Sequence, residues 1–543
     1  MNAPFTITID GRPVEVQAGE SVLAAARKIG LEIPTLCYLE KCGPLNTCQV
    51  CLVKTNGKLV PSCGTKATPG MVIESETEEV HEARRTALEL LFSDHVGDCL
   101  SPCHRLCPLQ LNVPVMLRHV QAGRIQEAAA GVRQALALPA VLGRLCHHPC
   151  EQGCRRNSLD DPAAIREMEK FVADEDLKSN VPYIPPCKPA SGKSVAIIGA
   201  GPAGLAAAHY LAREGHAVTV ADRQPQAGGT LRTKTTEEQL PRAVLDAELA
   251  QLARLGIQFK PGVELGRDLS LEGLLRGFDA VLLTVGEITA RELPKLGVRL
   301  GPPGIEADPN TGRTNVTGVF AAGSAVKPVK QLVKAMTEGR AVAECVHLHL
   351  LGRTPRRPEK VFSSVMGRLD PGEVREFLRH ASSVGRVSPC DRCLGHSPAE
   401  AALESSRCLH CDCRSSGNCV FQHWAQVYGA DANRFRSERK RFEQQTQPGG
   451  IIFEPGKCIV CGICVKLAEM AAEPLGLTFI GRGFDVRLAA PFNRTIEEGL
   501  QKVAAECVEH CPTGALVFQE NGRPEPKPQT FRASKPKPLS DPA

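Results

Sequence analysis

Hydrophobic and polar residues alternate at the start of the chain. Residues 5–16 read FTITIDGRPVEV, which predicts two strands joined by an Asp-Gly turn. The hydrophobic run at residues 21–30 predicts a short helix with Ser21 as its N-cap and a glycine at its end. A loop rich in cysteine follows. This order of elements predicts a small β-grasp domain over residues 1–85.

Further along, hydrophobic residues recur at helical spacing over residues 113–138. We therefore predict a helical hairpin within a domain that spans residues 86–180. After a proline-rich linker at residues 181–192, a hydrophobic run predicts a buried strand at 194–198, followed by glycines and a helix. Because 543 residues are too many for one core, we predict a multidomain protein of the α/β and α+β classes.

The glycines after that strand form the pattern Gly199-x-Gly201-x-x-Gly204. They permit a tight turn and let backbone N–H groups approach a pyrophosphate at the N-terminus of the helix. The next strand ends on Asp222, which is placed to bind a ribose hydroxyl. Strand, turn, helix, second strand and terminal acid together predict a Rossmann-like dinucleotide-binding domain over residues 192–355.

The amino-acid composition limits the kinds of cofactor and partner that we expect. The chain has 24 cysteines, 65 basic and 60 acidic residues, one Trp and four Tyr. Its polar start lacks the apolar region of a secretory signal, and no apolar run approaches ~18 residues, so we expect a cytoplasmic protein without a membrane span. In such a chain, cysteines favour metal or redox cofactors over disulfides. Balanced charge and scarce aromatic residues disfavour nucleic acid as a partner.

The first cysteine group has the spacing C-x10-C-x2-C-x11-C and consists of Cys37, Cys48, Cys51 and Cys63. Four thiolates on the loop of a β-grasp domain can ligate a [2Fe–2S] cluster, and zinc is the alternative. The group resembles the N-terminal ferredoxin domain of the complex I large iron–sulfur subunit and of iron-only hydrogenases. This resemblance implies one [2Fe–2S] cluster, with Cys42 as a spare thiol.

The second group joins a C-x3-C-x3-C-P run at residues 99–108 to a C-x3-C-x3-C run at residues 146–154. The region resembles the N-terminal domain of the glutamate synthase small subunit and of dihydropyrimidine dehydrogenase, which implies two [4Fe–4S] clusters. By this resemblance, one cluster is ligated by Cys107, Cys146, Cys150 and Glu169, and the other by Cys99, Cys103 and Cys154. The second cluster lacks a fourth cysteine, and His95 is our candidate, because a neutral imidazole can bind iron. A surface histidine and a solvated glutamate are the competing interpretations.

The third group lies at residues 385–425 and allows three interpretations. Its members are Cys390, Cys393, Cys408, Cys411, Cys413 and Cys419. A further [4Fe–4S] cluster held by the last four cysteines is the first interpretation. The C-x2-C-x14-C-x2-C spacing favours zinc as the second. A redox-active dithiol at the first C-x2-C is the third.

The fourth group lies at residues 450–520 and resembles a bacterial two-cluster ferredoxin that has kept one cluster. Its ligands would be Cys458, Cys461, Cys464 and Cys511, because in such ferredoxins the cysteine before proline completes the other motif's cluster. Ala468 stands where the first run normally has its fourth cysteine, so Cys507 is left without a cluster. The final residues, 521–543, are rich in Pro and Lys and predict a disordered tail.

Three later features resemble the two-dinucleotide flavoproteins and imply FAD. They are Gly229 after the acid, Gly286 at the end of a strand, and Gly323-Ser324 in a second FAD motif, where Ser324 replaces the family's Asp. That family also inserts a complete pyridine-nucleotide domain before Gly318. Only about 30 residues are available here, and one βαβ unit alone needs ~30. The chain is therefore predicted to lack an NAD(P)H domain.

Together these features predict an iron–sulfur flavoprotein that passes electrons between FAD and a chain of clusters. The predicted cofactors are FAD, one [2Fe–2S] cluster and three to four [4Fe–4S] clusters, with zinc as the alternative to one of them. We expect a subunit of a larger oxidoreductase, such as a formate dehydrogenase or a hydrogenase, whose partners are other redox subunits or ferredoxin. A self-sufficient flavoenzyme acting on ferredoxin, NAD(P)H or a small substrate is the alternative, and a zinc or interaction protein is the third. No catalytic residue is predicted.

Overall fold

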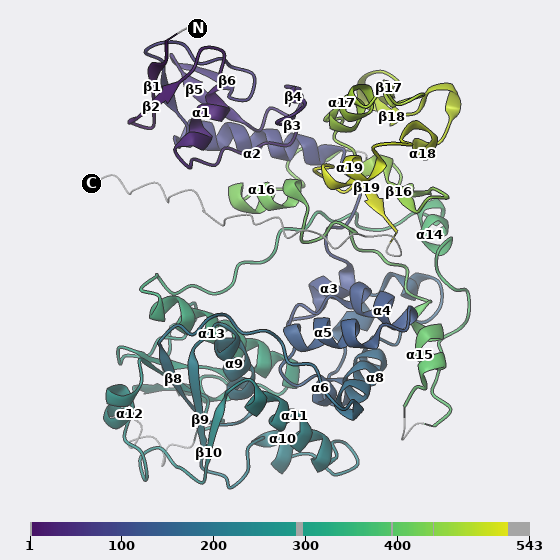
Figure 1. Cartoon of the computed structure of the whole chain (residues 1–543). Coiled ribbons are helices and arrows are strands. Elements are labelled where there is room, and N and C mark those ends of the chain that lie inside the picture. The colour runs from purple at the N-terminus through teal and green to yellow at the C-terminus, as the bar shows by residue number, and fades with distance from the viewer. Residues whose placement is uncertain (1–2, 289–296, 392–394, 438, 520–543) are drawn as a thin grey trace. The chain divides into compact units, whose positions relative to one another are not determined.

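The computed structural model describes residues 3–288, 297–391, 395–437 and 439–519 (Figure 1). These residues form two compact units, each of which combines segments that are far apart in the sequence. Unit 1 contains Met1–Leu100, Val361–Arg379 and Asp412–Ala543, and unit 2 contains Ser101–Lys360 and His380–Cys411. The predicted disordered tail at residues 521–543 lies outside the described residues. Within the described part of the chain, no helix has both the length and the apolar character needed to cross a membrane.

The N-terminal part of unit 1 has the predicted β-grasp architecture. Its sheet has the order β2-β1-β7-β5-β6, and the strands are β1 (Phe5–Ile9), β2 (Arg12–Val16), β5 (Leu52–Thr55), β6 (Lys58–Pro61) and β7 (Val72–Glu74). Strands β1 and β2 form the predicted hairpin, because Asp10 and Gly11 adopt the positive φ values, 46° and 75°, that a tight Asp-Gly turn requires. Helix α1 (Val22–Lys28) begins after Ser21, whose side chain accepts a hydrogen bond from the Ala24 N–H.

The remainder of unit 1 consists of one long helix and many short elements. The helices are α2 (Glu78–Ser93), α14 (Pro371–Leu378), α16 (Val420–Tyr428), α17 (Ile463–Met470), α18 (Ile496–Gly499) and α19 (Ala504–Glu509), and the strands are β15 (Gln445–Thr446), β16 (Ile451–Phe453), β17 (Thr478–Ile480), β18 (Arg487–Ala489) and β19 (Leu516–Phe518). Helix α2 packs against both β5 and α16. Its buried Arg84 donates hydrogen bonds to the Leu52 carbonyl of β5 and to the Tyr428 hydroxyl of α16. This side chain therefore joins the N-terminal sheet to a helix from late in the chain.

Unit 2 begins with the predicted helical region. Its helices are α3 (Pro102–Leu106), α4 (Val113–Gln121), α5 (Ile125–Ala135), α6 (Pro139–Leu145), α7 (Pro149–Gln152) and α8 (Ile165–Lys178), to which α15 (Pro398–Ser405) is added from later in the chain. The periodic run at residues 113–138 forms α4 and α5, which pack against each other as predicted. Helix α3 packs against α7, and this contact brings the two cysteine runs of the region together.

A five-stranded parallel sheet completes unit 2. Its order is β10-β9-β8-β11-β14, with strands β8 (Ser194–Ile198), β9 (Ala217–Asp222), β10 (Gln258–Pro261), β11 (Ala280–Leu283) and β14 (Val319–Ala321). The accompanying helices are α9 (Pro202–Arg213), α10 (Thr230–Thr233), α11 (Arg242–Arg254), α12 (Leu271–Gly277) and α13 (Leu332–Leu350). Because β8 has β9 on one side and β11 on the other, its carboxyl end is the switch point where such sheets bind ligands.

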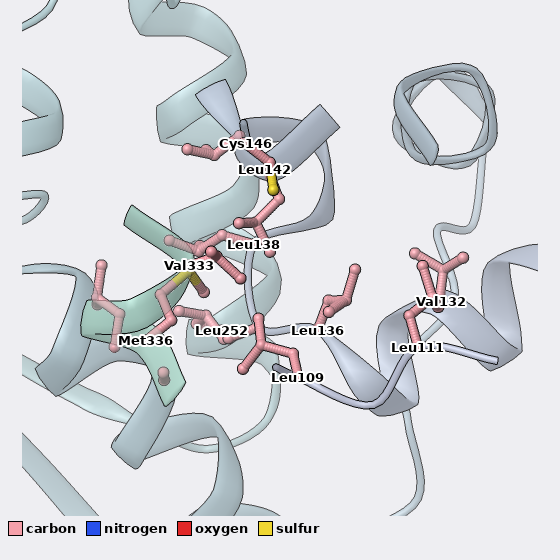
Figure 2. Packing of buried hydrophobic residues seen from close by; sticks show 14 of the residues in the cluster. Leu109, Leu111, Val132, Leu136, Leu138, Leu142, Cys146, Leu252, Val333 and Met336 are labelled. Atoms are coloured by element: carbon pink, nitrogen blue, oxygen red, sulfur yellow. The ribbon is translucent and has the colours of Figure 1, made fainter. Parts of the chain in front are cut away.

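The helical region and the parallel sheet share one hydrophobic core (Figure 2). In Figure 2, Leu138 and Leu142 of the helical region lie near Leu252 of α11 and Val333 and Met336 of α13. The helical region and the parallel-sheet region, predicted as separate domains, therefore belong to one compact unit.

A buried ion network reinforces that junction. Arg133 on α5 lies 2.5 Å from Asp176 on α8 and 2.6 Å from Glu248 on α11, and all three side chains are at most 4% exposed. Glu248 also accepts a hydrogen bond from the Ala140 N–H at 2.6 Å. Because a buried charge is stable only when it is paired and hydrogen-bonded, this network holds the two regions in one relative position.

Candidate iron–sulfur centres and flavin site

The four cysteines of the N-terminal domain lie together in buried positions. Each is at most 5% exposed, and the Sγ atoms of Cys51 and Cys63 are 3.3 Å apart. The thiols form two hydrogen-bonded pairs. The bond lowers the pKa of Cys37 and of Cys51, to about 5 and about 7, and raises the pKa of their partners Cys48 and Cys63. The burial and the mutual contact of these four cysteines fit the predicted [2Fe–2S] ligands.

The C-terminal cysteines line a single apolar pocket. It contains Cys458, Cys461, Cys464, Cys507 and Cys511. Burial raises the pKa of Cys458, Cys461 and Cys464, and the negative charge of Cys511 raises all three further. The four predicted ligands thus face one another, which fits one [4Fe–4S] cluster. Cys507, predicted to have no cluster, lies beside them with its Sγ 3.9 Å from the Cys464 carbonyl oxygen.

These two thiol sets are neighbours within unit 1. Thr47, in the N-terminal cysteine loop, donates its hydroxyl to the Cys461 carbonyl at 3.2 Å. A Cβ atom on Gly462 would lie 3.4 Å from the side chain of Leu45 in the same loop. The charge of Cys37 also contributes to the raised pKa of Cys461. The loop of the first candidate centre is therefore packed directly on the ligand loop of the second.

In unit 2, Cys107, Cys146 and Cys150 surround Glu169 as the resemblance implied. Burial is the main cause of the raised pKa of each thiol, and the Glu169 carboxylate raises all three further. Burial also raises the pKa of Glu169 to about 8. Its Oε1 atom is buried and has no hydrogen-bond partner among the residues that the structure describes. A buried acceptor without a partner is costly, and a bound iron would satisfy it.

A local backbone feature recurs at three cysteines. The residue two positions after each of them has a left-handed conformation, with φ between 45° and 55°, and directs its N–H toward the cysteine sulfur. The three pairs are Cys146–His148, Cys408–His410 and Cys458–Val460. Non-glycine residues seldom adopt this conformation, and N–H bonds to sulfur tune iron–sulfur centres. Cys408 therefore has the same local geometry as two predicted cluster ligands.

The boundary between the two units runs through the six-cysteine segment, for which we predicted three alternative sites. Cys390, Cys408 and Cys411 belong to unit 2, whereas Cys413 and Cys419 belong to unit 1. Cys390 is exposed, and Cys393 lies outside the described residues. The reason for this division is that the chain passes from one unit to the other between residues 411 and 412.

The boundary between the two units also falls within the predicted group of Cys99, Cys103 and Cys154, whose ligand role stays a prediction. Cys99 belongs to unit 1, where its carbonyl accepts the Cys413 N–H at 3.3 Å. Cys103 and Cys154 belong to unit 2, where the charge of Cys103 adds to the raised pKa of Cys150. The boundary between the units, at Leu100 and Ser101, separates residues that the cysteine spacing placed together.

Every cysteine that the structure describes is a free thiol. Within the described ranges, no three His, Cys, Asp or Glu side chains converge closely enough to hold a single metal ion. The thiol sets above are therefore considered as ligands of clusters, in which an iron and sulfide core lies between the thiolates.

The glycine-rich turn after β8 has the form of a pyrophosphate cradle. A Cβ atom on Gly204 would lie 2.0 Å from the Gly199 carbonyl oxygen, so this glycine is required by the fold itself. At Gly201, by contrast, a Cβ would meet no described protein atom within 4 Å. Gly201 is the N-cap of α9, and no side chain caps that end. The free N–H groups and the space beside Gly201 fit the pyrophosphate of a dinucleotide.

Asp222 lies at the end of β9, beside a cavity of about 300 Å³ that Ala200 and Phe259 also line. Its carboxylate accepts hydrogen bonds from the N–H groups of Ala200 and Gln224, at 2.7 and 2.8 Å. These bonds fix the acid against the glycine-rich turn. The cavity and the oriented acid fit the adenosine end of FAD, with Asp222 directed to a ribose hydroxyl.

The other predicted flavin residues border the same turn. A Cβ on Gly229 would lie 2.8 Å from Gly201 Cα, and one on Gly323 would lie 2.9 Å from Ala203 Cβ. Gly286 follows β11, next to the strand that precedes the turn. Ser324 accepts a hydrogen bond from the Val329 N–H at 3.2 Å. All four predicted positions therefore lie at the carboxyl edge of the sheet.

The described residues between Gly286 and Gly318 form one small hairpin, β12 (Leu300–Gly301) with β13 (Gly304–Ile305). This hairpin has no parallel strand or crossover helix, which a nucleotide-binding unit would need.

Three segments of the chain match known protein families. Residues 2–78 match the 2Fe-2S iron–sulfur cluster binding domain, residues 72–181 match domain II of dihydropyrimidine dehydrogenase, a 4Fe-4S cluster domain, and residues 197–254 match the NAD(P)-binding Rossmann-like domain. The predicted [2Fe–2S] domain, [4Fe–4S] helical domain and Rossmann-like domain are thereby confirmed.

The chain is also similar to subunits of several redox enzymes. It is 39% identical over 207 residues to the beta subunit of NADP(+)-dependent formate dehydrogenase from Moorella thermoacetica, covering 34% of this chain and 29% of that protein. It is 39% identical over 204 residues to the glutamate synthase [NADPH] small chain of Mycobacterium tuberculosis, covering 37% and 42%. It is 37% identical over 211 residues to a homologue of the PreT subunit of NAD-dependent dihydropyrimidine dehydrogenase from Salmonella typhi, covering 38% and 51%.

The chain thus matches about half or less of the length of each of these relatives. The predicted resemblance to the glutamate synthase small subunit and to dihydropyrimidine dehydrogenase is confirmed.

One residue of the candidate centres was not foreseen. Lys457 is 2% exposed and forms an ion pair with Glu454 inside unit 1. Burial favours a lower pKa for Lys457, but the charges of Cys413 and Glu454 outweigh it and raise the pKa. In the sequence, Lys457 is marked only by its position directly before Cys458. That position does not indicate that the lysine side chain is buried.

Proposed function

We propose that this chain is an electron-transfer subunit of a larger oxidoreductase and that it exchanges electrons between an FAD in unit 2 and a series of iron–sulfur centres. The observation that best supports this proposal is that the segments carrying neighbouring groups of cysteines in unit 1 are in direct contact. The N-terminal cysteine loop contacts Cys461, and the thiol of Cys419 contacts the carbonyl of Pro512, next to Cys511, at 3.4 Å. Successive redox centres must be close for electrons to pass between them, and these contacts provide that closeness.

FAD, when bound, supplies the conversion between paired and single electrons, and the clusters carry single electrons. The chain's own residues supply position and surroundings. The backbone at Gly201 and the N-terminus of α9 hold the pyrophosphate, and Asp222 binds the ribose. Arg133, Asp176 and Glu248 link the cluster-bearing helices α5 and α8 to helix α11, which accompanies the parallel sheet.

For the second cluster of unit 2 we propose the ligands Cys103, Cys154, Cys408 and Cys411. Cys103 and Cys408 belong to the same buried core, and Cys154 packs against it. Arg156, two residues after Cys154, donates to the carbonyl of Arg407, which precedes Cys408, at 2.6 Å. The left-handed His410 and its N–H bond to Cys408 match the geometry at Cys146. These contacts support a cluster shared by the Cys103–Cys154 and Cys408–Cys411 segments.

A partner subunit would supply the substrate chemistry. The relatives named above are subunits or chains of formate dehydrogenase, glutamate synthase and dihydropyrimidine dehydrogenase, and their names include NADP(+), NADPH or NAD. In this chain the described residues between Gly286 and Gly318 form only the hairpin β12–β13. We infer that a different subunit binds the nicotinamide or another substrate.

The test is reduction of the anaerobically purified protein, with iron and flavin quantified first. Dithionite should bleach both the flavin and the iron–sulfur absorbance, whereas NADH or NADPH alone should leave the flavin oxidised over minutes. Rapid bleaching by either nucleotide without a partner would replace this proposal with the self-sufficient flavoenzyme. Protein that contains zinc but neither iron nor flavin would refute both.

A further inference from the structure

Three buried cysteines from two distant segments meet in unit 1. They are Cys99, Cys413 and Cys419, and each is at most 9% exposed. The Cys413 N–H donates to the Cys99 carbonyl, so the two segments are joined by their backbones. Burial raises the pKa of Cys99, and the charge of Cys413 raises it further. Burial and the charges of Cys413 and Cys99 likewise raise the pKa of Cys419. A Cβ atom on Gly514 would lie 3.5 Å from Cys413 Sγ, and the Cys419 thiol donates to the carbonyl of Pro512, two residues before that glycine. Cys413 and Cys419 therefore lie beside the same turn, and the backbone bond of Cys413 brings Cys99 to it.

The end of helix α2 lies against the same set. The Phe421 ring stacks on Phe92 of α2 with 3.9 Å between centroids, and it lies 5.7 Å from the ring of His95. Phe421 follows Cys419 by two residues, and its N–H shares the Pro512 carbonyl with the Cys419 thiol. These aromatic contacts hold the His95 segment against the Cys419 segment.

His95 has an unused buried nitrogen at this place. Its Nδ1 atom is buried and has no hydrogen-bond partner in the described part of the chain. The ring is held in place between Phe92 and Phe421, whose ring centroids lie 5.5 and 5.7 Å from its own. A neutral imidazole nitrogen with a free lone pair is the form that ligates a metal. A bound iron would provide the partner that the buried nitrogen lacks.

Lys457 adds a buried positive charge to the same place. A Cβ atom on Gly97 would lie 2.7 Å from Lys457 Cε, which locates the lysine beside the His95–Cys99 segment. Its positive charge favours a lower pKa for each of His95, Cys99 and Cys413. Burying an ammonium is costly unless negative groups surround it, and Glu454 is its ion-pair partner. Thiolates that ligate iron would supply further negative charge.

We propose that His95, Cys99, Cys413 and Cys419 ligate a [4Fe–4S] cluster of their own in unit 1. This assignment rests on the proposed function and extends it. The Cys419–Pro512 contact places the new centre next to the C-terminal set. Replacing one thiolate by a neutral imidazole removes a negative charge and raises the potential, and the Lys457 ammonium acts in the same direction. The new centre is thus an electron acceptor for its neighbour.

The experiment uses the full chain, purified without oxygen, with Cys413→Ala, His95→Ala and His95→Cys. Cys413→Ala should lose one cluster's iron, about four atoms per chain, together with one EPR signal of the dithionite-reduced protein. The [2Fe–2S] signal and the flavin content should be unchanged, which shows that both units still fold. Cys42→Ala, which removes the spare thiol of the N-terminal loop, is the matched control and should lose no iron.

Pulsed EPR then tests the fourth ligand. The native protein should show a strong ¹⁴N coupling to one cluster, which disappears in His95→Ala and in His95→Cys but persists in the control His81→Ala. His95→Cys should retain its iron and shift that cluster to a lower potential.

Full iron content in Cys413→Ala would refute the new centre. A ¹⁴N coupling that survives in His95→Ala would refute the imidazole ligand. In both cases the other clusters and the flavin would still be reduced by dithionite, so the proposed function would stand. If even the native protein lacked iron and flavin, the proposed function would fail instead.

Discussion

The C-terminal thiol set and the His95 set lie in the same unit but are built in opposite ways. Cys458, Cys461 and Cys464 fall within seven consecutive residues just before and at the start of α17, and of the four predicted ligands only Cys511 joins their pocket from a later segment. Cys99 and Cys413, by contrast, are more than three hundred residues apart in the sequence. Local backbone geometry therefore positions three of the four predicted ligands of the first site, whereas the second site exists only when remote segments pack together.

The two sets also differ in charge. Burial and mutual repulsion of the thiols act on the C-terminal set, which lines an apolar pocket. In the second set, His95 replaces a thiol and Lys457 brings a buried ammonium. A site with less negative charge is easier to reduce. We therefore expect electrons to move from the C-terminal centre toward the His95 centre.

Loss of a ligand should give the largest effect. In Cys464→Ala the C-terminal centre keeps three thiols, and we expect its whole cluster to be lost, which iron analysis and EPR would measure. Cys507→Ala is the matched control, because this thiol lines the same pocket and is not one of the four predicted ligands. Loss of the cluster in Cys507→Ala rather than in Cys464→Ala would show that the ligands are assigned wrongly.

Loss of one packing contact should weaken the His95 site more than the C-terminal site. Phe92→Ala removes the ring that stacks on Phe421, at a cost of about 3–5 kcal/mol. We expect the His95 centre to lose iron at a lower urea concentration than in the native protein, while the C-terminal centre keeps its own. Phe484, which is 80% exposed in the same unit, provides the control Phe484→Ala with no change. Equal loss from both centres would contradict the distinction between a local and an assembled site.

The flavin site offers the same contrast between two glycines. Gly201→Ala has room for its Cβ, so unit 2 should fold normally but bind FAD at least tenfold more weakly, a loss of about 1.4 kcal/mol. Gly204→Ala would collide with the Gly199 carbonyl and should lower the stability of unit 2 itself. Flavin titration and thermal unfolding distinguish the two results. Unchanged FAD affinity in Gly201→Ala would mean that the pyrophosphate does not lie there.

The smallest effect should come from a helix cap. Ser21→Ala removes the hydrogen bond to the Ala24 N–H and should cost about 1 kcal/mol. Thermal unfolding followed by circular dichroism would measure this change. The Leu23 N–H also donates to the carbonyl of Ser62, next to the proposed ligand Cys63, and this bond does not involve the Ser21 side chain. Iron content should therefore not change, and a loss of iron would show that the cap itself supports the cluster.

Features with a short sequence range were predictable. The Asp-Gly hairpin, the Ser21 cap, the helices at residues 113–138 and the glycine-rich turn each depend on residues within a few positions of one another. Turn conformation, capping and hydrophobic periodicity are local interactions, so the sequence displays them directly.

Ligand grouping was less predictable, because spacing along the chain does not report distance across a fold. Cys411 and Cys413 are separated by one residue but belong to different units. Cys99 and Cys103 are separated by three residues and are divided in the same way.

The sequence by itself determined which chemical groups are available: clustered cysteines, a glycine-rich turn after one strand and an acid at the end of the next. The tertiary structure alone decided which cysteines meet, that the helical and flavin regions share a core, and that Lys457 is buried among the thiols. The physical reason is that local backbone preferences act over a few residues. Burial and charge act between whichever segments the fold brings together.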